Sequence, residues 1–184
     1  SVFNNITGNR IAACIPMHTF GFPCRIKEIA EICFDWGIPL IEDAAESLGS
    51  FVNEIHTGNF GIMGVLSFNG NKLITTGGGG MIITNNEEIA INAKHLTTTA
   101  KVPHDYEFIH DQIGYNYRMP NINASLGCAQ MENLSNFLDE KLKVTKRWKE
   151  FFNEWGVHFL QPDDGNRSNF WLNTIILDSK EQRD

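Results

Sequence analysis

Three residues that could do chemistry follow predicted strands of this 184-residue chain. Asp43 ends the run "IPLIED", Ser67 ends the run "GVLS", and Lys72 lies five residues after Ser67, ahead of the four glycines at 77–80. Ligands of open α/β sheets bind at the carboxyl ends of strands, so we expect these side chains to lie close together. Each has an ordinary explanation when taken alone. Asp43 could cap the segment that follows it, and a lone lysine is usually solvated. It is their coincidence that indicates a site.

A carboxylate, a hydroxyl and a primary amine are the groups that a pyridoxal phosphate site requires. The Lys72 amine could form a Schiff base with the cofactor aldehyde, and an ionised Asp43 would keep the pyridine nitrogen protonated. Ser67 could donate to the phosphate, and the glycines leave room for a bulky substrate. A nucleotide-binding P-loop is a competing interpretation of the glycines. It is disfavoured because they follow the lysine and no Gly-Lys-Ser/Thr sequence occurs.

The elements that must position these residues alternate along the chain. Strands are predicted within 10–16, 38–43, 64–70, 79–85, 157–162 and 170–177, and helices within 25–37, 87–96 and 121–156, the last broken near 133–136. This alternation predicts an α/β sheet, and the segment 97–108 is expected to be an exposed loop. Because a long helix connects the two sets of strands, we place a domain boundary near residue 135. Predicted core strands close to both termini favour a fragment truncated at both ends.

Composition excludes several classes of function. The net charge of −7, with scattered Lys and Arg, gives no basic stripe for nucleic acid. No apolar run approaches the roughly 20 residues that span a bilayer. The four cysteines lack metal-ligand spacing, which favours reduced, buried thiols in a cytoplasmic protein. We expect the four tryptophans to be core or domain-contact residues and His18 to be a packing residue of a turn.

Three separated blocks carry a resemblance to a known family. The blocks "IEDAAESLGS", "GVLSFNGNKLITTGGGGMIITN" and "IGYNYRMPNINASLGCAQMENL" resemble successive parts of the DegT/DnrJ/EryC1/StrS family. Its members are nucleotide-sugar aminotransferases that depend on pyridoxal phosphate, and the resemblance extends over about residues 10–180. It implies the three-layer fold type I of aspartate aminotransferase. Residues 1–135 would then be part of the large cofactor-binding domain, and 136–184 the connecting helix and the beginning of a small C-terminal α+β domain.

The resemblance also implies a role for each site residue. Lys72 would hold the cofactor, Asp43 would contact the pyridine nitrogen, and Ser67 would bind the phosphate. Glu46 takes a position, usually Gln in the family, close to the cofactor ring. Asn116 would reach across a homodimer interface to the partner's cofactor phosphate.

The implied reaction is a ping-pong transfer of an amino group, with glutamate as the expected donor, to C4 of a nucleotide-linked 4-keto-6-deoxy sugar. Where the family often has Gly-Glu-Gly-Gly, this chain has four glycines, which resembles the branch acting on UDP-linked 4-keto-6-deoxy-N-acetylhexosamines. Family members are much longer, and the part that precedes these blocks carries a phosphate loop and a ring-stacking aromatic residue. Dehydratases of the family have histidine in place of the lysine, so Lys72 disfavours that activity. A non-catalytic fragment or regulator of the same fold is the alternative.

Overall fold

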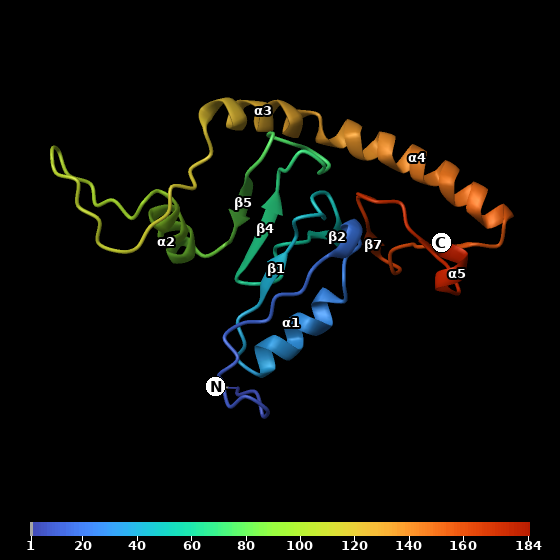
Figure 1. The fold of residues 1–184 in the computed structure, drawn as a ribbon, viewed down its shortest axis with the longest axis horizontal. Coiled ribbons are helices and arrows are strands. Elements are labelled where there is room, and N and C mark those ends of the chain that lie inside the picture. The colour runs from blue at the N-terminus through green and yellow to red at the C-terminus, as the bar shows by residue number, and fades with distance from the viewer. Residues whose placement is uncertain (1) are drawn as a thin grey trace.

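A mixed three-stranded sheet lies at the centre of the computed structural model, which describes residues 2–184 (Figure 1). Its order is β1 (Ile41–Asp43), β4 (Met63–Ser67) and β5 (Gly80–Ile83), with β1 parallel and β5 antiparallel to β4. Since β1 and β4 are parallel, their carboxyl ends lie at the same edge of the sheet. Asp43 and Ser67 therefore come to one edge, as the sequence predicts.

The predicted strand at 10–16 is largely wrong. Within residues 2–184, Arg10 forms an isolated antiparallel bridge with Phe3, and the segment then runs beside β1 through two isolated parallel bridges, Cys14 to Leu40 and, one residue beyond the segment, Met17 to Asp43. Pro16 lies between the two bridges and has no amide hydrogen, so it cannot donate to a continuous ladder.

Three helices surround the sheet and a fourth extends from it. The buried residues Ile26 and Cys33 of α1 (Ile26–Asp35) form an apolar cluster with Leu40 and Val52. The helix α2 (Glu87–Thr97) follows β5, and its N-cap Asn86 accepts a hydrogen bond from the Ile89 amide at 3.0 Å. The predicted break in the long helix is confirmed, because α3 (Asn121–Glu132) and α4 (Leu134–Glu154) meet at Asn133.

The second apolar cluster lies between the sheet and the start of α4. Its buried members are Ala44, Leu66, Phe68 and Ile74, and Leu134 and Phe137 pack against them. In Figure 1 the α3–α4 pair and α1 lie on opposite sides of β1 and β4. The strand ends that carry Asp43 and Ser67 are therefore held between two apolar layers.

Short strand pairs complete the structure and connect its two halves. One small sheet has the order β3 (Ile55–His56), β2 (Phe51–Val52) and β7 (Asn166–Arg167), and β6 (His158–Phe159) pairs with β8 (Ile175–Ile176). A 3₁₀ turn at Thr19–Gly21 and a final short helix α5 (Lys180–Arg183) are also present. Because β7 pairs with β2, the segment after α4 returns to the N-terminal half. The boundary near residue 135 stays a prediction.

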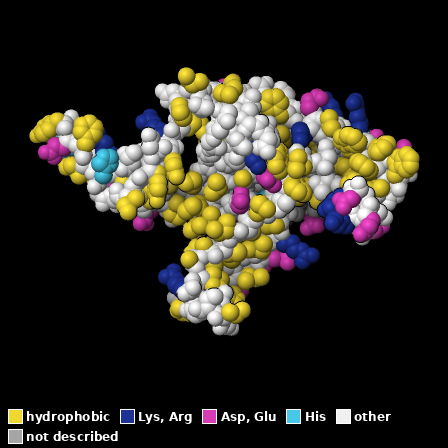
Figure 2. All heavy atoms as spheres, viewed as in Figure 1, with side chains coloured by type: hydrophobic (Ala, Val, Ile, Leu, Met, Phe, Trp, Pro, Cys, Tyr) yellow, Lys and Arg dark blue, Asp and Glu magenta, His cyan; other side chains and the backbone are white. Residues whose placement is uncertain are grey.

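Several apolar side chains are more exposed than the sequence predicts. Trp36, Trp148 and Trp155 are 61%, 47% and 72% exposed, so they are not core residues, and the alternative of a domain contact stays a prediction for them. Cys33 is buried and Cys14 and Cys24 are partly buried, but Cys128 lies exposed on α3, against the expectation of a buried thiol. Figure 2 shows hydrophobic side chains at both ends of the visible face, on the loop after α2 and at the end of α4. Within residues 2–184, no helix is both long and apolar enough to span a bilayer.

The close approach of β4 to the loop at Gly58 yields a first prediction. A Cβ placed on Gly64 would overlap the backbone of Gly58, whereas a Cβ on Gly70 would meet nothing within 4 Å. We expect Gly64→Ala to lower the free energy of unfolding by about 2 kcal/mol or more, and Gly70→Ala to change it by less than about 0.5 kcal/mol. Urea unfolding followed by circular dichroism measures both. Equal stability of the two variants would show that β4 does not pack so closely.

Candidate active site

Lys72 lies in a small pocket at the carboxyl ends of β1 and β4. Its Nζ is 3.4 Å from Glu46 Oε1, and the two side chains are only 13% and 18% exposed. Ser67 lines the same pocket. The structure therefore brings together three of the five residues to which the sequence assigns a role. The remaining lining residues are Ala45, Leu48, Leu73, Ile74 and Asn169.

Glu46 is held at both carboxylate oxygens. Oε2 accepts a hydrogen bond from the Phe20 amide at 2.7 Å, while Oε1 faces Lys72. The remaining space in the pocket is about 10 Å³, close to the room for one water molecule. The two side chains thus fill the pocket between them.

Asp43 satisfies both interpretations that the sequence leaves open. Its Oδ1 accepts a hydrogen bond from the Ala45 amide at 3.1 Å, which is the capping role. Its Oδ2 accepts no hydrogen bond from residues 2–184 and is available to a ligand. No hydrogen bond or ion pair joins Asp43 to Lys72 within the described part of the chain; both lie near the same sheet edge.

Asn116 lies away from the pocket. It is exposed, on the outstretched loop between α2 and α3, where it forms an isolated antiparallel bridge with Thr98 (Figure 1). Tyr115 and Tyr117 stack beside it, with ring centroids 5.2 Å apart. Within this chain the structure does not bring Asn116 to Lys72.

Sequence reasoning misses two residues of the site. The Trp171 ring lies under the Lys72 amine, with Nζ 4.1 Å from the ring centroid. Asn169 lines the pocket and is only 2% exposed. Trp171 was expected to be a core or domain-contact residue, and the contact is with a candidate catalytic side chain. No motif or spacing in "SNFWLN" signals this, because it depends on how the segment after α4 folds back.

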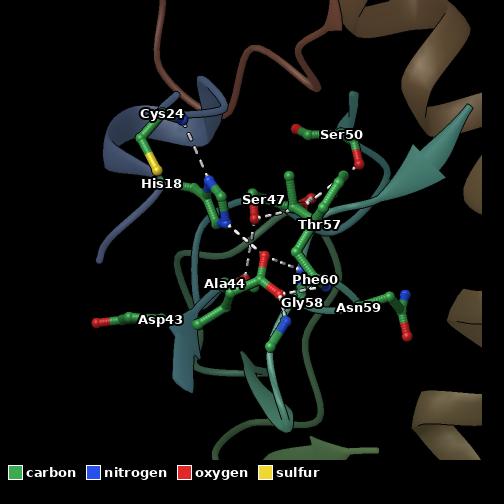
Figure 3. Close-up of polar contacts among 12 residues, drawn as sticks. His18, Cys24, Asp43, Ala44, Ser47, Ser50, Thr57, Gly58, Asn59 and Phe60 are labelled. Carbon is green, nitrogen blue, oxygen red and sulfur yellow. Dashed lines mark hydrogen bonds and ion pairs between the residues drawn. The ribbon is translucent and has the colours of Figure 1, made fainter. Parts of the chain in front are cut away.

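A buried polar cluster fixes the strand that carries Asp43 (Figure 3). Glu42 has no exposed surface, and its carboxylate accepts four hydrogen bonds: from His18 Nε2 at 3.0 Å and from the amides of Gly58, Phe60 and Gly61 at 2.6–2.9 Å. The Cys24 amide donates to His18 Nδ1 at 3.2 Å, so the ring proton lies on Nε2 and is donated to Glu42. The expected packing role of His18 is therefore confirmed, with Glu42 as its partner.

The side chains of Asp43 and of the cluster lie on opposite faces of β1. Successive side chains of a strand point to opposite faces, and in Figure 3 Asp43 points away from His18, Ser47 and Thr57. Ser47 Oγ and Thr57 Oγ1 are 2.7 Å apart and also completely buried. The cluster consequently orients Asp43 without competing for its carboxylate.

Burial and hydrogen bonding change the titration of groups in and near the cluster. Burial raises the pKa of Glu42, but the hydrogen bonds from His18 and from the three amides outweigh this and lower it below its ordinary value. Burial lowers the pKa of His56, whose Nε2 accepts a hydrogen bond from the Gly49 amide. Burial, assisted by the charge of Glu42, raises the pKa of Cys24. The cluster therefore favours an ionised Glu42, a neutral His56 and an un-ionised Cys24 thiol.

Other places in the structure are weaker candidates for this chemistry. A cavity of about 830 Å³ lies along β5 and α2, but none of the five assigned residues lines it. Within residues 2–184, no three His, Cys, Asp or Glu side chains are grouped as metal ligands.

Comparisons with known proteins support the interpretation of this site. The DegT/DnrJ/EryC1/StrS aminotransferase family matches residues 1–184. EpsN of Bacillus subtilis, provisionally named a pyridoxal phosphate-dependent aminotransferase, is 39% identical over 168 residues, which are 91% of this chain and 43% of EpsN. The GDP-perosamine synthase of Escherichia coli O157:H7 is 34% identical over 177 residues, 96% of this chain and 48% of that protein. The chain thus spans less than half the length of these relatives.

A solved structure confirms the predicted fold class. The aminotransferase TlmJ from Streptoalloteichus hindustanus superposes with a TM-score of 0.84 at 28% identity, over 88% of this chain and 45% of that one. The described sheet and helices are therefore part of a pyridoxal phosphate-dependent aminotransferase fold.

The buried carboxylate of Glu42 yields a second prediction. In Glu42→Gln an amide NH₂ replaces one acceptor, so two of the four donors lose their partner. We expect the free energy of unfolding at pH 7 to fall by about 3 kcal/mol. Because the pKa of Glu42 is lowered in the folded state, its stabilisation is present above pH 4.5 and is lost as the pH falls below that value. The difference between wild type and variant should therefore shrink toward pH 3.

Urea unfolding at several pH values measures this difference. Glu28→Gln is the matched control, because Glu28 is exposed on α1 and its carboxylate lies 3.7 Å from the exposed Arg25. A constant difference between wild type and Glu42→Gln from pH 7 to pH 3 would contradict the role given to the carboxylate.

Proposed function

Because the chain belongs to the DegT/DnrJ/EryC1/StrS aminotransferase family, we propose that it forms part of a nucleotide-sugar aminotransferase that depends on pyridoxal phosphate. One observation carries the proposal. The amine of Lys72 lies 3.4 Å from the Glu46 carboxylate in a pocket that Ser67 also lines, at the carboxyl edge of the parallel pair β1 and β4. Amine, carboxylate and hydroxyl thus converge at the edge where α/β sheets bind ligands.

The chemical groups of the residues present fit the cofactor. Lys72 would hold it covalently, Asp43 would use its available Oδ2 on the pyridine nitrogen, and Ser67 would donate its hydroxyl to the phosphate. Glu46, already fixed by the Phe20 amide, would lie beside the ring. When bound, pyridoxal phosphate supplies an electron sink for the carbon that loses its proton.

The side chains of this chain would then move the proton. Lys72 Nζ is the base that takes a proton from the carbon bearing the amino group of the donor, for which we propose glutamate, and later returns one to C4 of the sugar. Glu46, at 3.4 Å, stabilises the ammonium that Lys72 becomes after taking that proton. The Asp43 carboxylate would make a positive charge on the pyridine nitrogen favourable.

We propose a UDP-linked 4-keto-6-deoxy-N-acetylhexosamine as the acceptor. Support comes from the four glycines after Lys72 and from the blocks "DAAES" and "SFNGNK", which resemble that branch of the family. The name of the GDP-perosamine synthase relative makes a GDP-linked sugar the competing substrate. Partly buried thiols such as Cys14 and Cys24 suit a reducing compartment, so we propose the cytoplasm as the location.

We also propose a homodimer in which Asn116 serves the partner's site. Asn116 is exposed on a loop that extends away from the body of the molecule (Figure 1). Aromatic side chains on this loop are largely exposed, which suits an interface with a second copy: Tyr106, Phe108, Tyr115 and Tyr117. We propose that residues 1–135 belong to the large domain and 136–184 to the connecting helix and the small domain.

Borohydride reduction tests the cofactor assignment. The full-length protein mixed with pyridoxal phosphate should acquire a visible absorbance band, and reduction should fix the cofactor to Lys72, as seen by peptide mass mapping. Lys72→Ala should lose the fixed adduct, while Lys27→Ala, on the exposed face of α1, should keep it. Fixation at another lysine, or none at all, would reject Lys72 as the cofactor lysine and favour a non-catalytic protein of the same fold.

Turnover tests the roles of the side chains and the substrate. Lys72→Ala should abolish transamination, and Asp43→Asn should lower kcat about a thousandfold because it removes the charge opposite the pyridine nitrogen. Rates with UDP-linked and GDP-linked 4-keto-6-deoxy sugars identify the nucleotide. A Lys72→Ala variant with near wild-type turnover would overturn the mechanism, and a preference for the GDP-linked sugar would overturn only the substrate.

A further inference from the structure

Residues 168–173, which we call the strap, cross the candidate site and carry Trp171. On one side the strap is bonded to the 3₁₀ turn. Ser168 Oγ donates to the Gly21 carbonyl at 2.9 Å, and the Leu172 amide donates to the Phe20 carbonyl at 3.3 Å. This fixes the strap against the N-terminal half of the chain.

The helix α4 holds the other side of the strap. Lys141 Nζ donates to the Trp171 carbonyl at 2.8 Å, and Thr145 Oγ1 donates to Asn173 Oδ1 at 2.8 Å. The backbone of Trp171 is therefore fixed between two elements that are far apart in the sequence.

Asn169 connects the strap to the turn that carries Glu46. Its Nδ2 donates to the Glu46 and Leu48 carbonyls at 2.8 and 2.9 Å, and its Oδ1 accepts from the Trp171 amide at 2.8 Å. A carboxamide has two N–H donors and one carbonyl acceptor, and all three groups are used here. One buried side chain thus sets the relative position of Glu46 and Trp171.

The indole ring is aimed at the Lys72 amine. Trp171 Nε1 donates to the Asn71 carbonyl at 2.7 Å, so the ring is bonded to the residue next to Lys72. Lys72 Nζ lies 4.1 Å from the ring centroid, within the roughly 6 Å over which an aromatic face attracts a cation. The amine therefore contacts two groups that attract a cation, the indole face and the Glu46 carboxylate.

We propose that Trp171 is a positioning residue for Lys72: its indole and the Glu46 carboxylate hold the amine in one place, and Asn169 fixes both. The inference rests on the proposed function, in which Lys72 is the reacting amine. The indole face also covers part of the amine, so Lys72 must leave this contact to react. Trp171 thereby sets the position of the amine before reaction and limits the access of reagents to it.

The reactivity of the Lys72 amine tests this proposal without any cofactor. The cofactor-free full-length protein is treated with a limiting amount of acetic anhydride, and acetylation of Lys72 is followed by peptide mass mapping. Trp171→Leu removes both the shield and the attraction for the ammonium, so acetylation of Lys72 should become about fivefold faster. The exposed Lys27 serves as the internal reference and should react at the same rate in every variant.

Further variants separate positioning from a merely structural role. Trp171→Phe keeps an aromatic face and should hold the rate of Lys72 acetylation within about twofold of wild type. Trp36→Leu is the matched control, since Trp36 is 61% exposed at the end of α1 and should leave Lys72 unaffected. Circular dichroism verifies that each variant is folded, and Trp171→Met, which fills more of the space, replaces Trp171→Leu if the latter unfolds.

Each outcome decides the proposal. An unchanged rate at Lys72 in a folded Trp171→Leu or Trp171→Met variant overturns it, as does loss of the fold in both. A rise that is equally large in Trp171→Phe also overturns it, because the aromatic face would then be irrelevant. Failure of the proposed function is distinguishable. In that case reduction would not fix pyridoxal phosphate to Lys72, although acetylation would still respond to Trp171.

Discussion

The compensated burial of one carboxylate is the constraint on which the rest of the structure depends. Glu42 has no exposed surface, and an unpaired charge in such a position would cost several kcal/mol. Its four hydrogen bonds come from His18 and from the loop at 58–61. If β1 moved relative to either segment, the buried charge would lose some of these hydrogen bonds. Three residues beyond His18, the Gly21 carbonyl accepts from both Ser50 Oγ and Ser168 Oγ. The same buried network therefore extends from β1 to the strap, and through it the candidate site is fixed on both sides.

Sequence reasoning identifies the parts of the site that local pattern determines. Asp43, Ser67 and Lys72 follow short apolar runs, and the parallel pairing of β1 with β4 is enough to bring the strand ends together. Glu46 comes from the family resemblance, and the structure places it beside Lys72. Asn169 and Trp171 could not be predicted from the sequence, because their contacts span about 100 residues or more of it. A buried asparagine that satisfies three backbone groups has the same sequence signature as one on a surface loop.

The differences between the predicted and the observed fold also arise where local pattern does not determine the structure. Periodicity identifies the helices and their break at Asn133, because the i, i+3 and i, i+4 pattern is a property of the helix alone. It overestimates the strand at 10–16, where Pro16 interrupts the donors of the ladder. It also cannot tell which apolar faces are covered, since that depends on the neighbours of an element. Trp148 and Trp155 continue the apolar pattern of α4 but remain 47% and 72% exposed.

Glu46 occupies a position that is usually Gln in the family, and this difference affects how Lys72 is held. A neutral amide would offer Lys72 only a hydrogen bond, whereas the Glu46 carboxylate adds a charge–charge attraction at 3.4 Å in a partly buried pocket. The Phe20 amide holds this carboxylate directly, and Asn169 fixes the Glu46 backbone through its carbonyl. This hold places Lys72 Nζ between the carboxylate and the indole face, so the amine must leave both contacts to reach a reacting group. A ligand that takes over the interactions of Glu46 or displaces the amine from the indole would release Lys72 only when the site is occupied.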